Sequence, residues 1–393
     1  MSERRRVLLL TAGSAHALHE GVVAYAHEAR WALDTRMLYT GQVPDGGPVD
    51  GVLCRHVPRV DVTSFVRGLD VPVVMLDRCG SDAWPCVTCS DESIGRSAAR
   101  HLLERGYRTL AFCGPCDMPR KTLRMDGFKA EVEAAGERFV RLAPPPGAPA
   151  FGSAASVREW LGPMLATLHV PFAVMVGDDL EAIPLVDALG ACGYGVPEQV
   201  AVISAGNDPM LCDVAPVPVS SVDVRPREVG YEAARLLGQL MEGEARPTAP
   251  VLVEPGPVGA RASTDMMALP NLHSARALRF IWTRYREQIN VDNVSAHVPV
   301  TRRRLQTLFH DHMGRTMQEE IARVRIADAC LMLKKSTMRI NEIASLTGFK
   351  SSLHFHRTSQ SLLEMGPRAF RETGSIPNSG ILPAQVGDQL PAA

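Results

Sequence analysis

The sequence predicts an α/β domain with a parallel sheet, followed by an all-α domain that holds a double helix-turn-helix. Short apolar runs alternate with amphipathic helical segments over residues 5–265, the pattern of a sheet covered by helices. Two helix-turn-helix patterns, at 291–309 and 339–363, flank one long amphipathic segment. Residues 273–373 hold 17 basic and nine acidic side chains, a net charge of +8, and the rest of the chain carries −9. A basic domain joined to an acidic one favours contact with phosphates at one end only.

Length and cysteine content exclude several classes of protein. The 393 residues suffice for two or three domains with full cores. The nine cysteines are scattered and odd in number, which argues against a disulfide framework and predicts a reducing, cytoplasmic location. No run approaches the ~18 apolar residues of a membrane span, so no membrane partner is expected.

The N-terminal segment leaves one alternative open. MSERRRVLLLTAGSAHA imitates a secretion signal, because basic residues precede an apolar stretch and then small residues. Its unbroken apolar run, residues 7–10, is only four residues long, against about 7–15 for a signal core. The segment is therefore expected to form the first buried strand. An exported solute-binding protein remains the alternative.

The α/β part, residues 1–265, can be divided into elements from its apolar runs. Strands are expected at 7–10, 51–55, 71–77, 87–91, 110–114, 173–179, 200–206, 221–224 and 251–255. Helices are expected at 19–30, 94–106, 181–193 and 229–243. Strands without polar alternation are buried on both faces, which is typical of a parallel sheet. Gly106, Gly193 and Gly243 are expected to end three of the helices in the left-handed conformation.

Residues 266–272 are expected to form a linker because turn-forming residues gather around them. Residues 273–373 would form the basic helical domain. Residues 374–393 are rich in Gly, Pro and Gln with a single charge, Asp388, and are expected to be disordered.

The first helix-turn-helix unit has a clear inward and outward side. Asp292 is expected to cap a helix that buries Val294 and Val298, and Thr301 to cap the next one. Leu305, Leu308 and Phe309 would face inward on that second helix. The outward positions are Arg302, Arg303, Gln306 and Thr307. Arginine can read guanine edges and glutamine adenine edges in the major groove, and either can hold a phosphate.

The second unit repeats this arrangement after a bridging helix expected from Thr316 to about Leu333. Ile340, Ile343 and Ala344 would pack inward, and Gly348 would permit the turn. Ser351 is expected to cap a helix that presents Ser352, His354 and Arg357. A helical bundle that binds a protein partner is the alternative interpretation of the whole domain.

The motif NEIASLTGF followed by GPRAFR, within about 100 residues that carry both units, resembles the AraC family of transcription regulators. The resemblance implies a DNA-binding domain that contacts bases of duplex operator DNA. The implied base-contacting residues are Arg303, Gln306 and Thr307 in the first unit and Ser352, His354, His356 and Arg357 in the second. The chain departs from the family in two places. Pro299 stands where Gly is usual in the first turn, and Ser359-Gln360 stands where a buried Phe and a Lys are usual.

The segments VPVVMLDR, SDESIGRSAARHLLERGYRTLAFCG, RMDGFKAEVEAAG and VPEQVAVIS resemble the sensor of lactose-repressor-type regulators. That resemblance spans nearly all of residues 5–243 and implies a two-lobed periplasmic-binding-protein-like fold with a sugar in the cleft. A sensor of this type followed by an AraC-type domain resembles the xylose-responsive regulators. The implied effector is a carbohydrate-like molecule, xylose or a related sugar or polyol. The implied further partners are a second copy in a homodimer, and RNA polymerase if the protein activates.

The same resemblance implies where the effector would bind. The implied ligand-binding residues are Thr11, His16, Asp77, Arg124, Asp178 and Asn207. Gly206 falls where the family has a cleft Asp, so Asn207 or Asp208 is expected to replace it from a shifted backbone. Val224 stands where a Gln often lines the cleft, which leaves room for a smaller, less polar or differently branched ligand. A helix cap or a surface ion pair is the alternative for each charged residue.

Metal and enzyme chemistry find little support in the sequence. The pairs Cys86/Cys89 and Cys113/Cys116 suggest a metal or redox-responsive regulator, but 23 residues separate them, more than the ~15–20 of a zinc pattern. Phosphate-binding and nucleophile motifs are missing, so no catalytic residues, no metal and no cofactor are expected.

Overall fold

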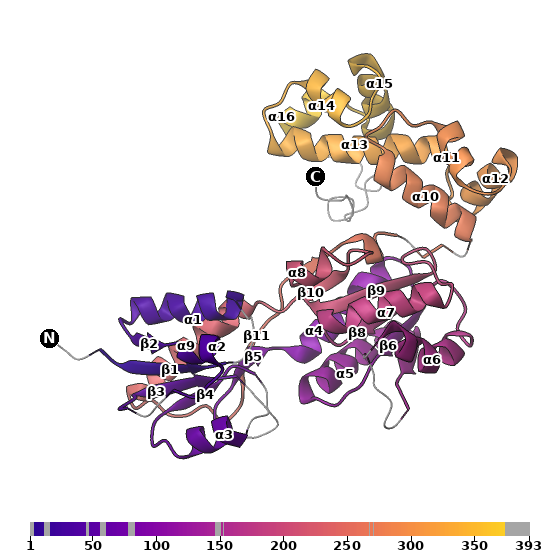
Figure 1. The fold of residues 1–393 in the computed structure, drawn as a ribbon. Helices are drawn as coiled ribbons and strands as arrows, with labels where there is room; N and C mark the ends of the chain where they lie inside the picture. The colour runs from indigo at the N-terminus through magenta and orange to yellow at the C-terminus, as the bar shows by residue number, and fades with distance from the viewer. Residues whose placement is uncertain are drawn as a thin grey trace.

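The computed structural model consists of two α/β lobes followed by a helical domain (Figure 1). It describes residues 4–11, 16–44, 47–55, 60–77, 83–145, 151, 153–266, 268–269 and 271–373. The expected disordered tail, 374–393, lies outside these residues. No described helix combines the length and the apolar character that crossing a membrane requires.

The first lobe holds a four-stranded parallel sheet. Its strand order is β2 (Ala32–Asp34), β1 (Arg6–Leu10), β3 (Gly51–Cys54) and β4 (Val73–Met75). The helices of this lobe are α1 (His16–Glu28), α2 (Arg36–Thr40), α3 (Val60–Arg67) and α9 (Pro226–Met241). The N-terminal apolar run is a buried strand in the middle of this sheet, as predicted. The sequence did not predict β2, α2 or α3.

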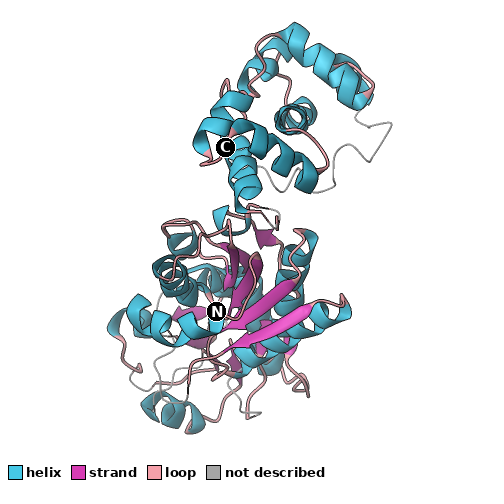
Figure 2. Cartoon of the chain, turned by 90° about the vertical axis from the view of Figure 1, so that its right-hand side faces the viewer, coloured by secondary structure: helices cyan, strands magenta, loops and turns pink. Residues whose placement is uncertain are grey.

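The second lobe holds a six-stranded sheet, with helices on both faces (Figure 2). Its strand order is β12 (Val258–Gly259), β10 (Ser220–Asp223), β9 (Val200–Gly206), β8 (Phe172–Val176), β6 (Thr109–Cys113) and β7 (Arg138–Leu142). Only the edge strand β12 is antiparallel. The helices are α4 (Asp91–Glu104), α5 (Pro119–Ala134), α6 (Ala154–Leu165), α7 (Asp179–Ala191) and α8 (Pro209–Cys212), with a 3₁₀ turn at Ala262–Thr264. The predicted parallel sheet is thus confirmed as two separate sheets.

The two lobes are joined by a pair of short parallel strands, β5 (Val87–Cys89) and β11 (Val251–Val253). Both were expected as strands. Their apolar sequence did not indicate that they connect the two lobes. The helix ends predicted at glycine are confirmed, because Gly106, Gly193 and Gly243 all have φ between 85° and 88°.

Each lobe contains one tightly packed helix pair that needs glycine. A Cβ at Gly95 of α4 would collide with the carbonyl oxygen of Arg124, and one at Gly127 of α5 with that of Glu92. Gly21 of α1 and Gly230 of α9 meet the partner backbone in the same way. Because α4 and α5 lie this close, the side chains at the start of α5 are held beside the start of α4.

The helical domain contains seven helices that enclose two apolar clusters. They are α10 (Leu272–Arg284), α11 (Val291–His297), α12 (Arg302–Met313), α13 (Met317–Lys335), α14 (Ile340–Leu346), α15 (Ser352–Leu363) and α16 (Pro367–Thr373). The long helix α13 contributes to both clusters, as expected of the bridging helix.

The predicted caps of this domain are confirmed with one correction. Thr301 and Ser351 each accept a backbone hydrogen bond at the start of their helices, and so does Thr316, which was expected only as the start of the bridging helix. The cap of α11 is Asn290, whose side chain accepts from the backbone of Asp292 and Asn293. Both Asn290 and Asp292 are residue types that cap helices. The prediction of Asp292 was wrong because the helix already begins at Val291, which leaves Asn290 in the capping position.

Residues that were expected to form a linker pack against the helical domain. Met266 and Leu269 are buried in the same apolar cluster as Trp282 and Phe309. Asn271 caps α10 by accepting from the backbone of His273 and Ser274. Part of the connection between the sensor lobes and the helical domain therefore belongs to the apolar core of the helical domain.

Candidate functional site

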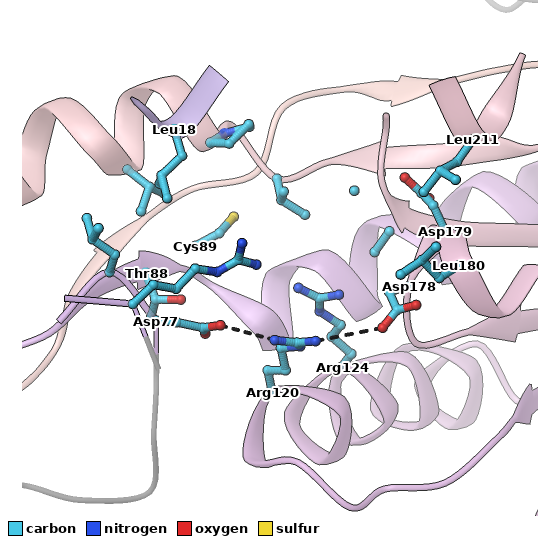
Figure 3. A pocket seen from close by; sticks show the side chains of 17 residues that line it. Leu18, Asp77, Thr88, Cys89, Arg120, Arg124, Asp178, Asp179, Leu180 and Leu211 are labelled. Atoms are coloured by element: carbon cyan, nitrogen blue, oxygen red, sulfur yellow. Dashed lines mark hydrogen bonds and ion pairs between the residues drawn. The ribbon is translucent and has the colours of Figure 1, made fainter. Parts of the chain in front are cut away.

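A cavity of about 270 Å³ lies between the two lobes, where the carboxyl ends of strands from both sheets meet (Figure 3). Ligands of open α/β folds bind at this place. Its charged lining residues are Arg55, Asp77, Arg120, Arg124, Asp178 and Asp179. Its apolar lining includes Leu18, Leu76, Leu180, Leu211, Val224 and Val229. Polar groups on an apolar wall suit a small polar ligand with some apolar surface.

Arg120 connects the two lobes across this cavity. Its Nη1 donates to Asp77 Oδ2 of the first lobe at 3.0 Å. Its Nη2 lies 3.7 Å from Asp178 Oδ2 of the second lobe. Figure 3 shows the guanidinium between the two carboxylates. Arg120 itself lies on α5 of the second lobe, so a ligand that replaces its contact with Asp77 would change how strongly the lobes attract each other.

Arg124, one helical turn after Arg120, is fixed more firmly. Its Nε donates to Asp91 Oδ1 at 2.9 Å, and its Nη1 donates to the carbonyl oxygen of Gly177 at 2.7 Å. Burial raises the pKa of Asp91 even though Arg124 favours the charged form. Both side chains are buried, so the guanidinium has little freedom to change orientation.

Asp178, at the start of α7, keeps one oxygen available. Its Oδ1 is buried and has no hydrogen-bond partner among the residues that the structure describes. A buried carboxylate oxygen without a donor is costly, at about 1–3 kcal/mol. A ligand hydroxyl that donates to it would remove this cost.

Asp179 occupies the space opened by Gly206. It accepts from the hydroxyls of Ser204 and Ser221 at 2.5 and 2.6 Å, and from the backbone N–H of Asp208 at 2.9 Å. A Cβ at Gly206, whose φ is 145°, would collide with the Asp179 carboxylate. The missing carboxylate at 206 is therefore compensated from α7, which the sequence reasoning did not anticipate.

The structure places three of the predicted ligand residues away from the cavity. Asn207 accepts from Arg261 Nη1 at 2.9 Å and does not line it. Thr11 is fully buried and bonds to His19 Nε2 at 2.9 Å. His16 is exposed at the start of α1 and also lies outside the lining. By contrast Asp77, Arg124 and Asp178 all line the cavity.

Three charged lining residues were missed, and two of them carried a signal in the sequence. Arg55 directly follows β3, at the same edge of the sheet where Asp77 follows the neighbouring strand β4. Arg120 precedes Arg124 by four residues and so shares its helix face. Asp179 was missed because it directly follows Asp178. The sequence of two adjacent carboxylates does not show that both line the cleft.

The cysteines do not form the alternative metal site. Cys86, Cys89 and Cys113 are buried in three different apolar clusters. Cys116 instead lies beside Met125 and Arg141. Burial raises the pKa of Cys89 to about 12, so its thiol is a poor ligand and a poor redox group. Across the described ranges no three metal-ligating side chains gather.

The first helix-turn-helix unit presents its predicted residues to solvent. Arg302, Arg303, Gln306 and Thr307 are all exposed on α12. Leu305, Leu308 and Phe309 are buried on the opposite side, as predicted. Arg302 pairs with Asp292, which leaves Arg303 and Gln306 as the outward side chains with the fewest contacts.

In the second unit, some of the predicted base-contacting side chains already contact other residues of the chain. On α15, His356 and Arg357 are exposed, whereas Ser352 and His354 are half-buried. Ser352 Oγ donates to Asn341 Oδ1 at 2.7 Å, and the His354 ring packs edge-on against Phe349. His356 lies against Gly366, where an added Cβ would come within 2.8 Å of its Nε2.

Ser359, which stands where the family has a buried Phe, is itself buried. Its hydroxyl donates to the carbonyl oxygen of Met365 at 2.8 Å. Leu363 is buried beside it and Leu362 packs against the same cluster, together with Phe355. The core of the second unit therefore lacks the usual phenylalanine at position 359. Leu362 and Leu363 pack in this region instead, and Ser359 makes one hydrogen bond there.

Two family models match the chain. A periplasmic binding protein-like domain matches residues 99–264, and a helix-turn-helix domain matches residues 294–373. The second match covers both units described above. The first covers most of the second lobe, including Arg120 and Arg124 of the cleft.

Curated proteins and solved structures give the same result. The xylose operon regulatory protein of Escherichia coli (strain K12) is 28% identical over 339 residues, covering 83% of this chain and 84% of that protein. A probable transcription factor of Proteus vulgaris is 30% identical over 93 residues, or 76% of its length. The solved structure of a xylose-binding transcription activator, 25% identical, superposes with a TM-score of 0.69 and covers 94% of this chain and 98% of that one.

These similarities extend over both parts of the molecule and leave the exported-binding-protein alternative without support. The cleft and the double helix-turn-helix stand in the same order as in the xylose operon relatives. The chain therefore joins a periplasmic binding protein-like sensor to an AraC-type helix-turn-helix DNA-binding domain, and it is homologous to the xylose operon regulatory proteins.

Proposed function

We propose that this regulator controls transcription in response to a monosaccharide or a related polyol that binds between the sensor lobes. The observation that carries the proposal is the set of ionised groups from both lobes around one small cavity. Ionised donors and acceptors make the stronger hydrogen bonds to hydroxyl groups. A cavity of about 270 Å³ is near the lower end of the ~300–1,000 Å³ usual for ligands, which favours a single sugar ring.

The similar proteins support a pentose as the first candidate. The relative from Escherichia coli is named for a xylose operon, and the superposed structure is named as xylose-binding. The apolar Val224 and Leu211 in the lining favour a sugar with one face free of hydroxyls. Xylose meets this requirement better than a hexose with an extra hydroxymethyl group.

A thermal-shift screen of the full chain against pentoses, hexoses, polyols and sugar acids tests the proposal. A ligand at 100 times its dissociation constant should stabilise the sensor by about 2.7 kcal/mol. Asp178→Ala and Arg124→Ala should remove this shift, and Arg158→Ala, on the far helix α6, should keep it. No shift with any sugar, or an unchanged shift in both cleft variants, would contradict the proposed effector site.

The DNA contacts are proposed to come mainly from the first unit, through Arg303 and Gln306. Thr307 on α12 and His356 and Arg357 on α15 are also exposed, and they complete the proposed contact set. The assay is binding to the tightest duplex that the full chain selects from a random-sequence library. Binding should fall steeply with added salt, because each phosphate contact releases counterions.

We further infer that the protein acts as a homodimer through its sensor lobes and contacts RNA polymerase if it activates. Two copies would present four recognition helices to neighbouring turns of one operator. Sedimentation at micromolar concentration, with and without the selected duplex, tests this. A monomer in both conditions would argue against the dimer.

A further inference from the structure

A second cavity, of about 540 Å³, lies between the second lobe and the DNA-binding domain. Most of its lining comes from one side of α10, and the remainder from Glu198, before β9, and His297, at the end of α11. This cavity is separate from the cleft between the lobes, since none of its lining residues contributes there.

The α10 side of this cavity is basic for a simple geometric reason. Arg279, Phe280, Thr283 and Arg284 follow Arg276 by three, four, seven and eight residues. These spacings keep the side chains on one side of a helix. Another side of α10 is buried in the core through Leu278, Ile281 and Trp282. The three arginines therefore lie outside this core, on the side of α10 that faces Glu198 of the second lobe.

Positive charge exceeds negative charge around this cavity. Glu198 is the one carboxylate in the lining, and it pairs with Arg279. Arg276 has no ion pair within the described ranges. Asp265 lies near Arg279, but burial raises the pKa of its carboxyl to about 7, so it compensates only in part.

Aromatic contacts hold the remaining cation in place. The Arg284 guanidinium lies 5.5 Å from the centre of the Phe280 ring, and that ring packs 4.8 Å from the His297 ring. Glu287, outside the lining, comes within 3.7 Å of Arg284. A guanidinium stacked on a ring keeps its fork of donors directed toward an anion.

We propose that this cavity binds a small phosphorylated anion, as a second input that acts independently of the sugar cleft. Several guanidinium groups around one space match the oxygens of a phosphate dianion, and arginine binds such groups in a bidentate manner. The anion competes with Glu198 for Arg279. Its binding therefore weakens the ion pair that ties the DNA-binding domain to the second lobe, and changes how the domain is presented to DNA.

Calorimetric titration of the full chain with pyrophosphate, at constant ionic strength, tests the proposal. Saturable binding of one pyrophosphate per chain is expected. Arg276→Gln should weaken it by about tenfold, the usual effect of losing a hydrogen bond between charged groups. Glu198→Gln should strengthen it several-fold, because Arg279 is then no longer engaged. The matched control, Arg368→Gln, changes an exposed, ion-paired arginine on α16 and should bind as the parent does.

Three results would overturn the proposal, and a fourth would overturn its assignment to phosphate. One is the absence of saturable pyrophosphate binding. Another is equal binding by the parent, Arg276→Gln and Arg284→Gln, with folding checked by circular dichroism. The third is weaker DNA binding by Arg276→Gln without pyrophosphate binding by the parent, which would assign these arginines to the DNA backbone. Citrate binding as tightly as pyrophosphate would refute the phosphate assignment. The sugar-induced thermal shift should be the same in all variants, so failure here leaves the effector proposal intact.

Discussion

The two helix-turn-helix units share a backbone plan but differ in what their outward side chains already contact. In the first, Arg303 and Gln306 are exposed, and their side chains form no hydrogen bond in the described part of the chain. In the second, Ser352 is bonded to Asn341 and the His354 ring is packed on Phe349. Donors that are already engaged must give up a contact before they bind a base. The comparison therefore supports our proposal that base reading comes chiefly from the first unit.

Each recognition helix, by contrast, buries one phenylalanine almost completely, Phe309 in α12 and Phe355 in α15. The two rings stand at different places relative to the caps Thr301 and Ser351, because Ser359 occupies the place of Phe309 in the second unit. The units therefore differ in their outward surface and in the position of this buried ring. This difference can be tested by changing core and surface residues in turn.

The largest effect is expected from Phe355→Ala. Removal of this buried ring should lower the free energy of unfolding by about 3–5 kcal/mol, because a cavity remains in the cluster around it. Affinity for the selected duplex should fall but remain measurable, since the first unit is intact. Phe309→Ala is the matched change, and it should abolish binding. Equal loss in the two variants would show that the units contribute alike.

Arg303→Ala should weaken binding to the selected duplex by about 1–3 kcal/mol and relax base preference under its half-site. Arg357→Ala, which removes an exposed arginine from the recognition helix of the second unit, should cost less. Arg368→Ala, on α16, serves as the control for a general loss of positive charge. A larger effect of Arg357→Ala would reverse the ranking of the units.

Ser359→Ala should lower the free energy of unfolding by about 1 kcal/mol, because the buried carbonyl oxygen of Met365 loses its donor. The neighbouring exposed Ser361→Ala should leave stability unchanged. Urea unfolding monitored by circular dichroism measures both. If Ser359→Ala is as stable as the parent, the hydroxyl does not stabilise the second unit.

The smallest effect is expected from Ser352→Ala. Its hydrogen bond to Asn341 lies at the surface, so stability should change by no more than about 0.5 kcal/mol. Affinity for the selected duplex should change as little, because this hydroxyl is already engaged. A loss of affinity comparable to that of Arg303→Ala would place Ser352 among the base-reading residues.

The sequence by itself determined the elements whose pattern is local. The apolar run at 7–10 predicted β1, Gly106 and Gly193 predicted helix ends, and the spacing of Leu305, Leu308 and Phe309 predicted the inward side of α12. Each of these features depends on residues within a few positions of each other. The edge strand β7 was missed because its RFVRL pattern is charged and half-buried, as edge strands often are.

The tertiary structure decided which polar groups meet. Arg120 and Asp77 are 43 residues apart in the chain, and Asp179 fills the space that Gly206 leaves 27 positions later. Met266 and Leu269 looked like linker residues until the packing of the helical domain buried them. Such contacts arise when separate elements pack against each other, and their geometry has no local sequence signature. The chain thus encoded its elements locally, and packing of the lobes assembled the cleft.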